Sequence, residues 1–209
     1  MPQDWPNLNK YQKANAILAE PDTTENRIVF MGDSITEFWS TINPNFFVGK
    51  PYINRGISGQ TSPQMLLRFR ADVIALKPSL VVILAGVNDI AGNTGPATLE
   101  QITDNIFSMI DIAKTHNIEV ILCAALPAAD FPWRPNQKPA DKIIVLNRLL
   151  TDYANANTIP FVDYHKALAD DQNGLALAYS NDGVHPNKAG YEVMAPLLEK
   201  AIEFILAKR

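Results

Sequence analysis

Ser79-Leu80-Val81-Val82-Ile83-Leu84-Ala85 is the stretch that decides the fold, because five apolar residues follow one another in it without a polar break. A strand that is apolar on both faces is typical of a parallel sheet covered on both sides. Shorter strand-like blocks, separated by helical patterns, lie on either side of it at residues 27–31, 51–54, 118–124 and 159–162. This alternation predicts an α/β fold, a doubly wound three-layer α/β/α sandwich on a five-stranded parallel sheet.

The segments between these blocks predict helices and two notable loops. Apolar residues recur at helical spacing near residues 8–18, 62–77, 99–113, 141–154 and 187–207. In the first of these, Leu8, Tyr11, Asn15 and Leu18 share one face. Residues 86–96 are expected as a loop, and the proline-rich residues 126–139 as a long irregular loop of the kind that shapes binding sites.

Composition bounds the class of protein. The chain has 209 residues, 47% hydrophobic and 19% charged, which predicts one globular domain over residues 1–209. A net charge of −4 without a Lys/Arg run indicates no nucleic-acid partner and no anionic membrane surface. The one cysteine, Cys123, excludes an intrachain disulfide framework and a multi-cysteine zinc site.

The sequence predicts a soluble protein. No apolar run reaches the length of about 20 residues that crosses a bilayer, and residues 1–10 lack the apolar core of a signal peptide. A cytoplasmic protein and an exported one with its leader removed both fit this pattern. Whether the chain forms a homo-oligomer is left open.

Ser34 follows the first predicted strand directly. A serine in this place is most often a helix cap. The same place directs backbone N–H groups and the positive end of a helix dipole toward whatever the hydroxyl attacks. Ser34 is therefore a candidate nucleophile as well as a candidate cap.

The segment Asp182-Gly183-Val184-His185-Pro186 places a carboxylate three residues before one of the three histidines in the chain. Such a pair can share a hydrogen bond that fixes the imidazole tautomer and stabilises the imidazolium. An Asx turn before the last helix is the competing interpretation.

Two further turns carry groups that could stabilise an oxyanion. Asn88, in Gly86-Val87-Asn88-Asp89 after the central strand, has a side-chain amide that can donate to a developing negative charge. Gly59 could offer its backbone N–H, or could only supply a positive φ angle. Taken singly, each segment also reads as an ordinary turn.

Together these segments resemble the four blocks of the SGNH hydrolase (GDSL esterase/lipase) family. Gly32-Asp33-Ser34-Ile35, Gly59, Gly86–Asp89 and Asp182–His185 occur in the family's order. The first three follow predicted strands, and the fourth precedes the last predicted helix. The isoleucine stands where the family name has leucine. The resemblance extends to members similar to platelet-activating-factor acetylhydrolase and to carbohydrate acetylesterases, and it implies a flavodoxin-like sandwich.

The resemblance also implies roles for these residues. Ser34 is the expected nucleophile, His185 the base, and Asp182 the group that orients the base. The expected oxyanion hole consists of the N–H groups of Ser34 and Gly59 with the Asn88 side chain. This chemistry is a two-step acyl transfer that requires neither a metal nor an organic cofactor.

The expected substrate is a small ester with a short acyl group, acetyl above all, on a carbohydrate or a similar molecule. Residues expected to line its site are Asp33, Trp39, Phe131, Trp133 and Arg134. A lysophospholipase or thioesterase of the same family is the alternative. A metal-dependent phosphoesterase with Asp33, Asp182 and His185 as ligands, and a noncatalytic binding module, also stay open.

Overall fold

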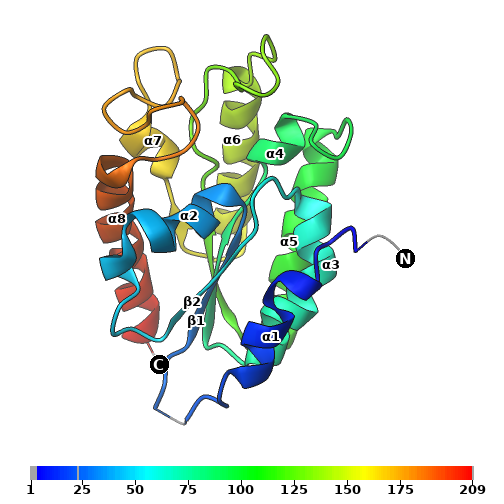
Figure 1. Cartoon of the computed structure of the whole chain (residues 1–209), viewed down its shortest axis with the longest axis vertical. Coiled ribbons are helices and arrows are strands. Elements are labelled where there is room, and N and C mark those ends of the chain that lie inside the picture. The colour runs from blue at the N-terminus through cyan, green and yellow to red at the C-terminus, as the bar shows by residue number, and fades with distance from the viewer. Residues whose placement is uncertain (1–3, 23, 209) are drawn as a thin grey trace.

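A five-stranded parallel sheet forms the centre of the protein (Figure 1). The computed structural model describes residues 4–22 and 24–208. The strand order is β2-β1-β3-β4-β5, and every pair is parallel. The strands are β1 (Ile28–Gly32), β2 (Tyr52–Gly56), β3 (Leu80–Leu84), β4 (Glu119–Cys123) and β5 (Phe161–Val162). The predicted fold class, with five parallel strands, is confirmed.

Helices cover both faces of the sheet (Figure 1). Apolar side chains of α3, α5 and α6 pack on one face, and those of α2, α7 and α8 pack on the other. The helices are α1 (Asn9–Ile17), α2 (Ser34–Ile42), α3 (Ser62–Asp72), α4 (Val87–Ile90), α5 (Leu99–Thr115), α6 (Ala140–Ala156), α7 (Tyr164–Leu168) and α8 (Lys188–Leu206), with 3-10 turns at Pro44–Phe46 and Ile74–Leu76.

Strand β1 shows why the run of apolar residues predicts a sheet covered on both sides. Val29 and Met31 point into the core beneath α3 and α5, while Ile28 and Phe30 point into the core beneath α2 and α8. Successive side chains of a strand face opposite sides, so only an unbroken apolar run can fill both cores.

The order of the strands determines where a site can form. β1 and β3 are neighbours, with Gly32 beside Leu84, although the chain visits β2 between them. The strand order reverses at this point, and in open α/β sheets ligands bind outside the carboxyl ends of the strands at such a switch point. The segments that follow β1 and β3, which hold Ser34 and Asn88, therefore start side by side.

The structure departs from the predicted elements in three places. Helix α2 begins at Ser34, a region for which no helical range was predicted. A single helical turn, α4, lies within residues 86–96, which were expected to form a loop, and the short helix α7 follows β5 where no helix was expected. Both are shorter than the two turns that apolar spacing needs in order to show a helical period. No helix of the described residues combines the length and the apolar character needed to span a bilayer.

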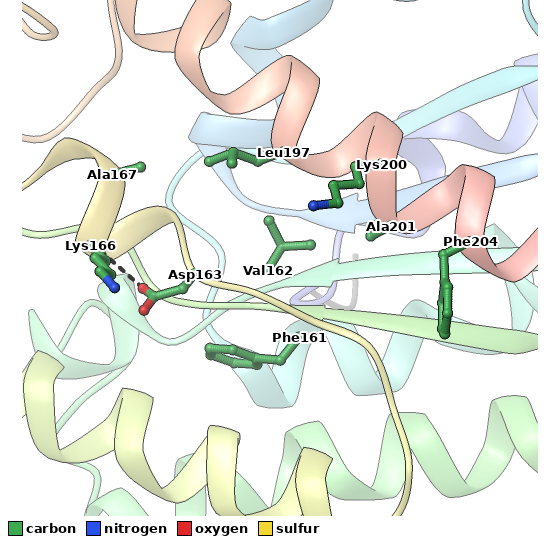
Figure 2. A pocket seen from close by; sticks show the side chains of 9 residues that line it. All are labelled: Phe161, Val162, Asp163, Lys166, Ala167, Leu197, Lys200, Ala201 and Phe204. Atoms are coloured by element: carbon green, nitrogen blue, oxygen red, sulfur yellow. Dashed lines mark hydrogen bonds between the residues drawn. The ribbon is translucent and has the colours of Figure 1, made fainter.

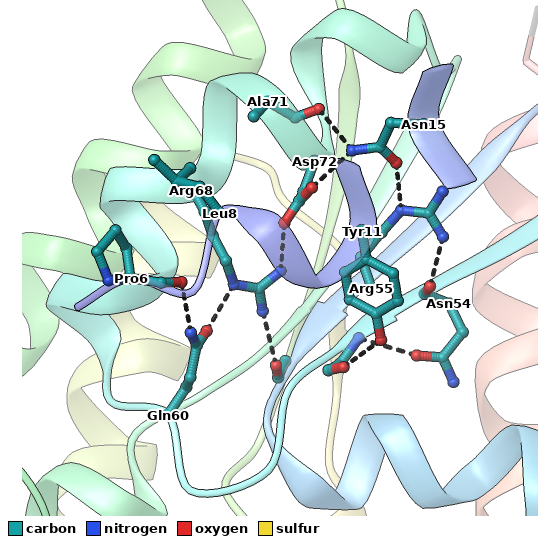
Figure 3. A network of polar contacts seen from close by, with 12 residues as sticks. Pro6, Leu8, Tyr11, Asn15, Asn54, Arg55, Gln60, Arg68, Ala71 and Asp72 are labelled. Atoms are coloured by element: carbon teal, nitrogen blue, oxygen red, sulfur yellow. Dashed lines mark hydrogen bonds and ion pairs between the residues drawn. The ribbon is translucent and has the colours of Figure 1, made fainter. Parts of the chain in front are cut away.

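The predicted N-terminal helix forms, but polar contacts hold it instead of a buried apolar face (Figure 3). None of the side chains of α1 is buried. The Tyr11 hydroxyl donates to the carbonyl of Gly56. Asn15 donates to Asp72 at 2.7 Å and accepts from Arg55 Nε at 2.9 Å. Hydrogen bonds therefore attach helix α1 to β2 and to α3.

Candidate active site

Ser34 is the first residue of α2, directly after β1. The Asp33 carboxylate accepts a hydrogen bond of 2.9 Å from the Ile35 N–H and thereby caps this helix. Asp33, and not Ser34, supplies the cap, so the Ser34 hydroxyl is left for another partner. The partial positive charge of the helix N-terminus lies at this hydroxyl.

That partner is His185, 151 positions further along the chain. Ser34 Oγ lies 2.9 Å from His185 Nε2, and His185 Nδ1 lies 2.7 Å from Asp182 Oδ2. The other carboxylate oxygen, Asp182 Oδ1, accepts from the backbone N–H groups of Val184 and His185 at 2.9 and 2.8 Å. The segment is thus an Asx-type turn and a carboxylate–imidazole pair at once, so the two interpretations of it do not compete.

The two aspartates near this pair have pKa values shifted in opposite directions. Burial raises the pKa of Asp33 to about 6, although the hydrogen bond from Ile35 and the proximity of His185 act against it. Burial also acts to raise the pKa of Asp182, but hydrogen bonds from His185 and Val184 outweigh it and lower that pKa to about 2. Asp182 is therefore a carboxylate at neutral pH.

Gly59 and Asn88 border the same open space as Ser34 and His185. Gly59 has a φ of +77°, in the left-handed region that glycine adopts without strain. Asn88 lies on α4, and its Nδ2 donates to Asp33 Oδ2 at 3.2 Å and to the Gln60 carbonyl at 3.1 Å. The structure thus brings the predicted nucleophile, base, orienting carboxylate and oxyanion donors to one place.

Two charged side chains hold the loop that carries Gly59. On one side, Glu37 of α2 accepts from the Ser58 N–H at 2.7 Å and from the Ser58 hydroxyl at 2.6 Å. On the other side, the Gln60 side chain bonds Arg68 at 2.5 Å and the Pro6 carbonyl at 2.8 Å (Figure 3). The loop is therefore fixed from both ends.

Arg68 of α3 connects this loop to the strand before Ser34 (Figure 3). Its buried guanidinium donates to the Gly32 carbonyl and to Asp72 Oδ2, both at 3.0 Å, in addition to Gln60. One planar cation thus reaches the end of β1, the Gly59 loop and a buried carboxylate.

An open hollow of about 310 Å³ gives access to these groups. Its walls include Phe38 of α2 and Trp133 of the 126–139 loop, whose ring centroids lie 5.4 and 6.2 Å from that of His185. The residues that line it are Ser34, Phe38, Ser58, Gly59, Asn88, Asn93, Trp133 and His185.

Of the five residues expected to line the substrate site, Trp133 borders this hollow and the other four do not. Trp39 is 2% exposed and stacks on Phe46 within the core beneath α8, and Phe131 is fully buried in the opposite core. Asp33 is buried behind Ser34, where it caps α2. Arg134 borders a neighbouring hollow instead. Trp39 and Phe131 are core residues because large apolar rings gain more free energy inside than at an open rim.

A larger hollow lies elsewhere, between β5, α7 and α8 (Figure 2). It measures about 620 Å³, and its walls are mostly apolar, with Phe161, Leu197 and Phe204 among them. Two lysines and Asp163 are its charged residues. It contains neither a hydroxyl nucleophile nor an imidazole, so it lacks the groups for acyl transfer.

The ligand set of the phosphoesterase alternative does not converge. The Asp33 carboxylate faces Ile35 and Asn88, whereas Asp182 and His185 bond to each other. Residues 4–22 and 24–208 contain no cluster of three or more His, Cys, Asp or Glu side chains that could hold a metal ion.

Sequence reasoning missed three residues of the hollow, Phe38, Ser58 and Asn93. Ser58 directly precedes the predicted Gly59. Phe38 lies four positions after Ser34 on the same helix, and residues four apart share a helix face. This spacing was a usable signal. Asn93 lies in the turn after α4, where no periodic pattern indicates which way a side chain points.

Comparison with known proteins places this geometry in a family. A model described as the GDSL-like lipase/acylhydrolase family matches residues 30–193. A Bacteroides fragilis protein of known structure is 50% identical, with a TM-score of 0.96 over 98% of this chain and 99% of that one.

Two enzymes are more distantly similar. The isoamyl acetate-hydrolyzing esterase of Saccharomyces cerevisiae is 24% identical over 85% of this chain and 86% of its own length. An acetylxylan esterase of Geobacillus stearothermophilus is 27% identical over 75% of this chain and 74% of its own. The predicted resemblance is confirmed: the chain belongs to the GDSL-like lipase/acylhydrolase family and is a carboxylic ester hydrolase.

Proposed function

We propose that this chain removes short acyl groups, above all acetyl, from esters of a carbohydrate or a similarly small alcohol, through an acyl-enzyme on Ser34. The observation that carries the proposal is the pair of hydrogen bonds from Ser34 to His185 (2.9 Å) and from His185 to Asp182 (2.7 Å) beside an open hollow. A hydroxyl, an imidazole and a carboxylate in this order form the arrangement that activates a serine for attack on a carbonyl.

The charge of Asp182 determines the direction of proton transfer. A carboxylate can only accept hydrogen bonds, so the proton of a neutral His185 ring lies on Nδ1. Nε2 is then free to accept the Ser34 proton as Oγ attacks the ester carbonyl, and Asp182 stabilises the imidazolium that forms. The imidazolium returns the proton to the leaving alcohol, and water attacks the acyl-enzyme in the same way.

The oxyanion of each tetrahedral intermediate would be held by the N–H groups of Ser34 and Gly59 and by Asn88 Nδ2. The two bonds that Asn88 Nδ2 already makes, at 3.1 and 3.2 Å, are at the long end of the N–H···O range. A charged oxygen competes well with the neutral Gln60 carbonyl for such a donor, because hydrogen bonds to ionised acceptors are roughly twice as strong as neutral ones.

The size of the hollow supports a short acyl group. A volume of about 310 Å³ is at the lower end of the range for small-molecule sites, roughly 300 to 1,000 Å³. Phe38 and Trp133 offer flat aromatic faces beside His185, on which a sugar ring or another small alcohol portion could pack. The similar yeast and Geobacillus enzymes are both named for acetyl esters, which favours the same acyl group here.

The test is a series of p-nitrophenyl esters from acetate to palmitate, together with acetylated xylose derivatives, assayed with the wild type and with Ser34→Ala. We expect kcat/KM to be highest for acetate and to fall as the chain lengthens. Ser34→Ala should lose at least about 10³-fold in kcat on every ester, because the nucleophile is gone.

Other outcomes assign other functions. A maximum at long chains would favour the lysophospholipase or thioesterase alternative. Phosphoester hydrolysis that a chelator abolishes and Ser34→Ala retains would favour the metal-dependent enzyme. Failure of an organophosphonate to label Ser34, with no ester hydrolysed, would contradict the proposal in favour of a binding module.

A further inference from the structure

Asn93 lies where the oxyanion side of the hollow meets the aromatic wall. Its Nδ2 donates to Asn88 Oδ1 at 2.8 Å and to the Gly59 carbonyl at 3.2 Å. Its Oδ1 accepts from the indole Nε1–H of Trp133 at 3.0 Å. The Asn93 side chain thus bonds to Gly59 and Asn88, two residues of the proposed oxyanion hole, and also to Trp133 of the aromatic wall.

The chemistry of the indole gives these bonds a direction. The indole N–H can only donate, so Asn93 must turn its oxygen toward Trp133 and its NH₂ group toward the opposite side. On that side it meets two oxygens, those of the Gly59 carbonyl and the Asn88 side chain. Asn88 must therefore present its oxygen to Asn93 and its own NH₂ group toward Asp33 and the Gln60 carbonyl.

The groups at the other end of Asn88 require the same orientation. Asp33 Oδ2 and the Gln60 carbonyl can only accept in this arrangement, and both accept from Asn88 Nδ2. Asn93 therefore completes the hydrogen bonding of a buried amide whose donor end must stay in one place while charge develops on the substrate. Electrostatic stabilisation of this kind depends on donors that do not need to reorient during the reaction.

We propose that Asn93 is a positioning residue for acyl transfer, and that Trp133 acts through it, so that the indole N–H contributes to turnover in addition to the contribution of the ring to binding. The inference rests on the proposed function, because it assigns Asn88 to the oxyanion. It adds a link between the wall that would contact the alcohol portion of the substrate and the donors that would contact the acyl carbonyl.

Kinetics of Asn93→Leu and Trp133→Phe on p-nitrophenyl acetate test the link. Asn93→Leu removes all three side-chain hydrogen bonds and keeps the number and branching of the side-chain heavy atoms. We expect kcat to fall about 10- to 100-fold, less than for loss of a whole oxyanion donor. Trp133→Phe keeps an aromatic wall and removes only the N–H, and kcat should fall about two- to tenfold, as for one neutral hydrogen bond. Asn155→Leu, an exposed residue at the far end of α6, is the matched control and should leave kcat and KM unchanged.

The double variant shows whether Trp133 acts through Asn93. If it does, Trp133→Phe has no further effect on kcat in the Asn93→Leu background, because the bond that it removes is already gone. Independent, multiplicative losses would overturn the link. A change confined to KM would also overturn it, because Trp133 would then serve only as a wall.

A structural measurement separates this inference from the proposed function. In ¹⁵N spectra, Asn93→Leu should shift the Trp133 indole resonance and speed hydrogen exchange at the Asn88 side-chain amide. Unchanged Asn88 exchange would contradict the positioning role even in an active enzyme. If Ser34→Ala retains ester hydrolysis while both spectral changes occur, the proposed function is contradicted, but the Asn93 contacts with Trp133 and Asn88 are supported. Urea unfolding of each variant identifies any loss that comes from a failure to fold.

Discussion

Asp33 and Asp182 each lie next to one member of the Ser34–His185 pair, yet they stand in opposite surroundings. Asp33 is 1% exposed and bonds to the end of α2 and to Asn88. The Asp182 side chain is 43% exposed and lies in the turn before α8. Burial raises the pKa of Asp33 to about 6, whereas hydrogen bonds from His185 and Val184 outweigh burial and lower the pKa of Asp182 to about 2.

The difference separates two halves of the site. In one half, Ser34 and Asn88 are buried, and Arg68 and Glu37 hold the Gly59 loop, whose tip is exposed, beside them. The half with His185 is a surface turn held by local hydrogen bonds. A nucleophile and oxyanion donors need fixed positions, while a base must exchange protons with the substrate and water. The location of each half therefore suits its role. Substitutions in the exposed half should mainly lower activity, and those in the buried half should mainly lower stability.

The largest effect is expected in the exposed half, on activity. Asp182→Asn should lower kcat on p-nitrophenyl acetate by about 10³- to 10⁴-fold, which corresponds to about 4 to 5.5 kcal/mol of transition-state stabilisation. The amide NH₂ group would donate to His185 Nδ1, so the ring proton would lie on Nε2. A protonated Nε2 cannot accept the proton of Ser34. Stability should change little by comparison. Asp171→Asn, in an exposed turn, is the control, and a loss below tenfold in Asp182→Asn would remove the carboxylate from the mechanism.

The next largest effect is expected in the buried half, on stability. Arg68→Met removes the cation paired with Asp72, and both side chains are buried. Breaking such a pair from one side costs about 3 to 5 kcal/mol, because a charge is left uncompensated in the interior. Urea unfolding with an unchanged m-value measures this loss.

The chain offers a matched exposed pair for the same substitution. Lys77 and Glu20 form an ion pair in which both side chains are more than half exposed. Lys77→Met should cost less than about 1 kcal/mol. Arg68→Met combined with Asp72→Leu should recover part of the loss, and equal costs at the two pairs would show that burial does not set the difference.

The sequence predicted the fold well because the fold depends on patterns along single strands. Apolar runs place β1 and β3 within a residue of their observed bounds, and the segments after them lie at the switch point. The contact between Ser34 and His185 could not follow from such patterns. It depended on the ordered motif of the family, which the comparison with the family model supports.

The fate of the aromatic residues could be predicted only in part. On α2, Phe38 lies four residues after Ser34 and shares its face, whereas Trp39 lies four after Ile35 and shares the buried face. Helical geometry alone distinguishes these two. Phe131 and Trp133 lie in an irregular loop, so which ring turns inward depends on neighbours from other segments. Asn93 could not be predicted for the same reason, because two of its three side-chain partners, Gly59 and Trp133, come from distant parts of the chain.

The smallest effect is expected from the titration of Asp33. Its proton is held more tightly in the folded state, with a pKa of about 6, than in the unfolded chain, with a pKa near 4. The stability from this group is therefore full below pH 4 and is lost as the pH rises through about 6, a change of at most about 3 kcal/mol. Asp33→Asn keeps an oxygen to cap α2 but cannot titrate. The free energy of unfolding of the wild type minus that of Asp33→Asn should therefore be larger at pH 4 than at pH 7.5. A difference independent of pH, or one that grows in the opposite direction, would show that Asp33 resembles Asp182 after all, and would remove the contrast between the two halves of the site.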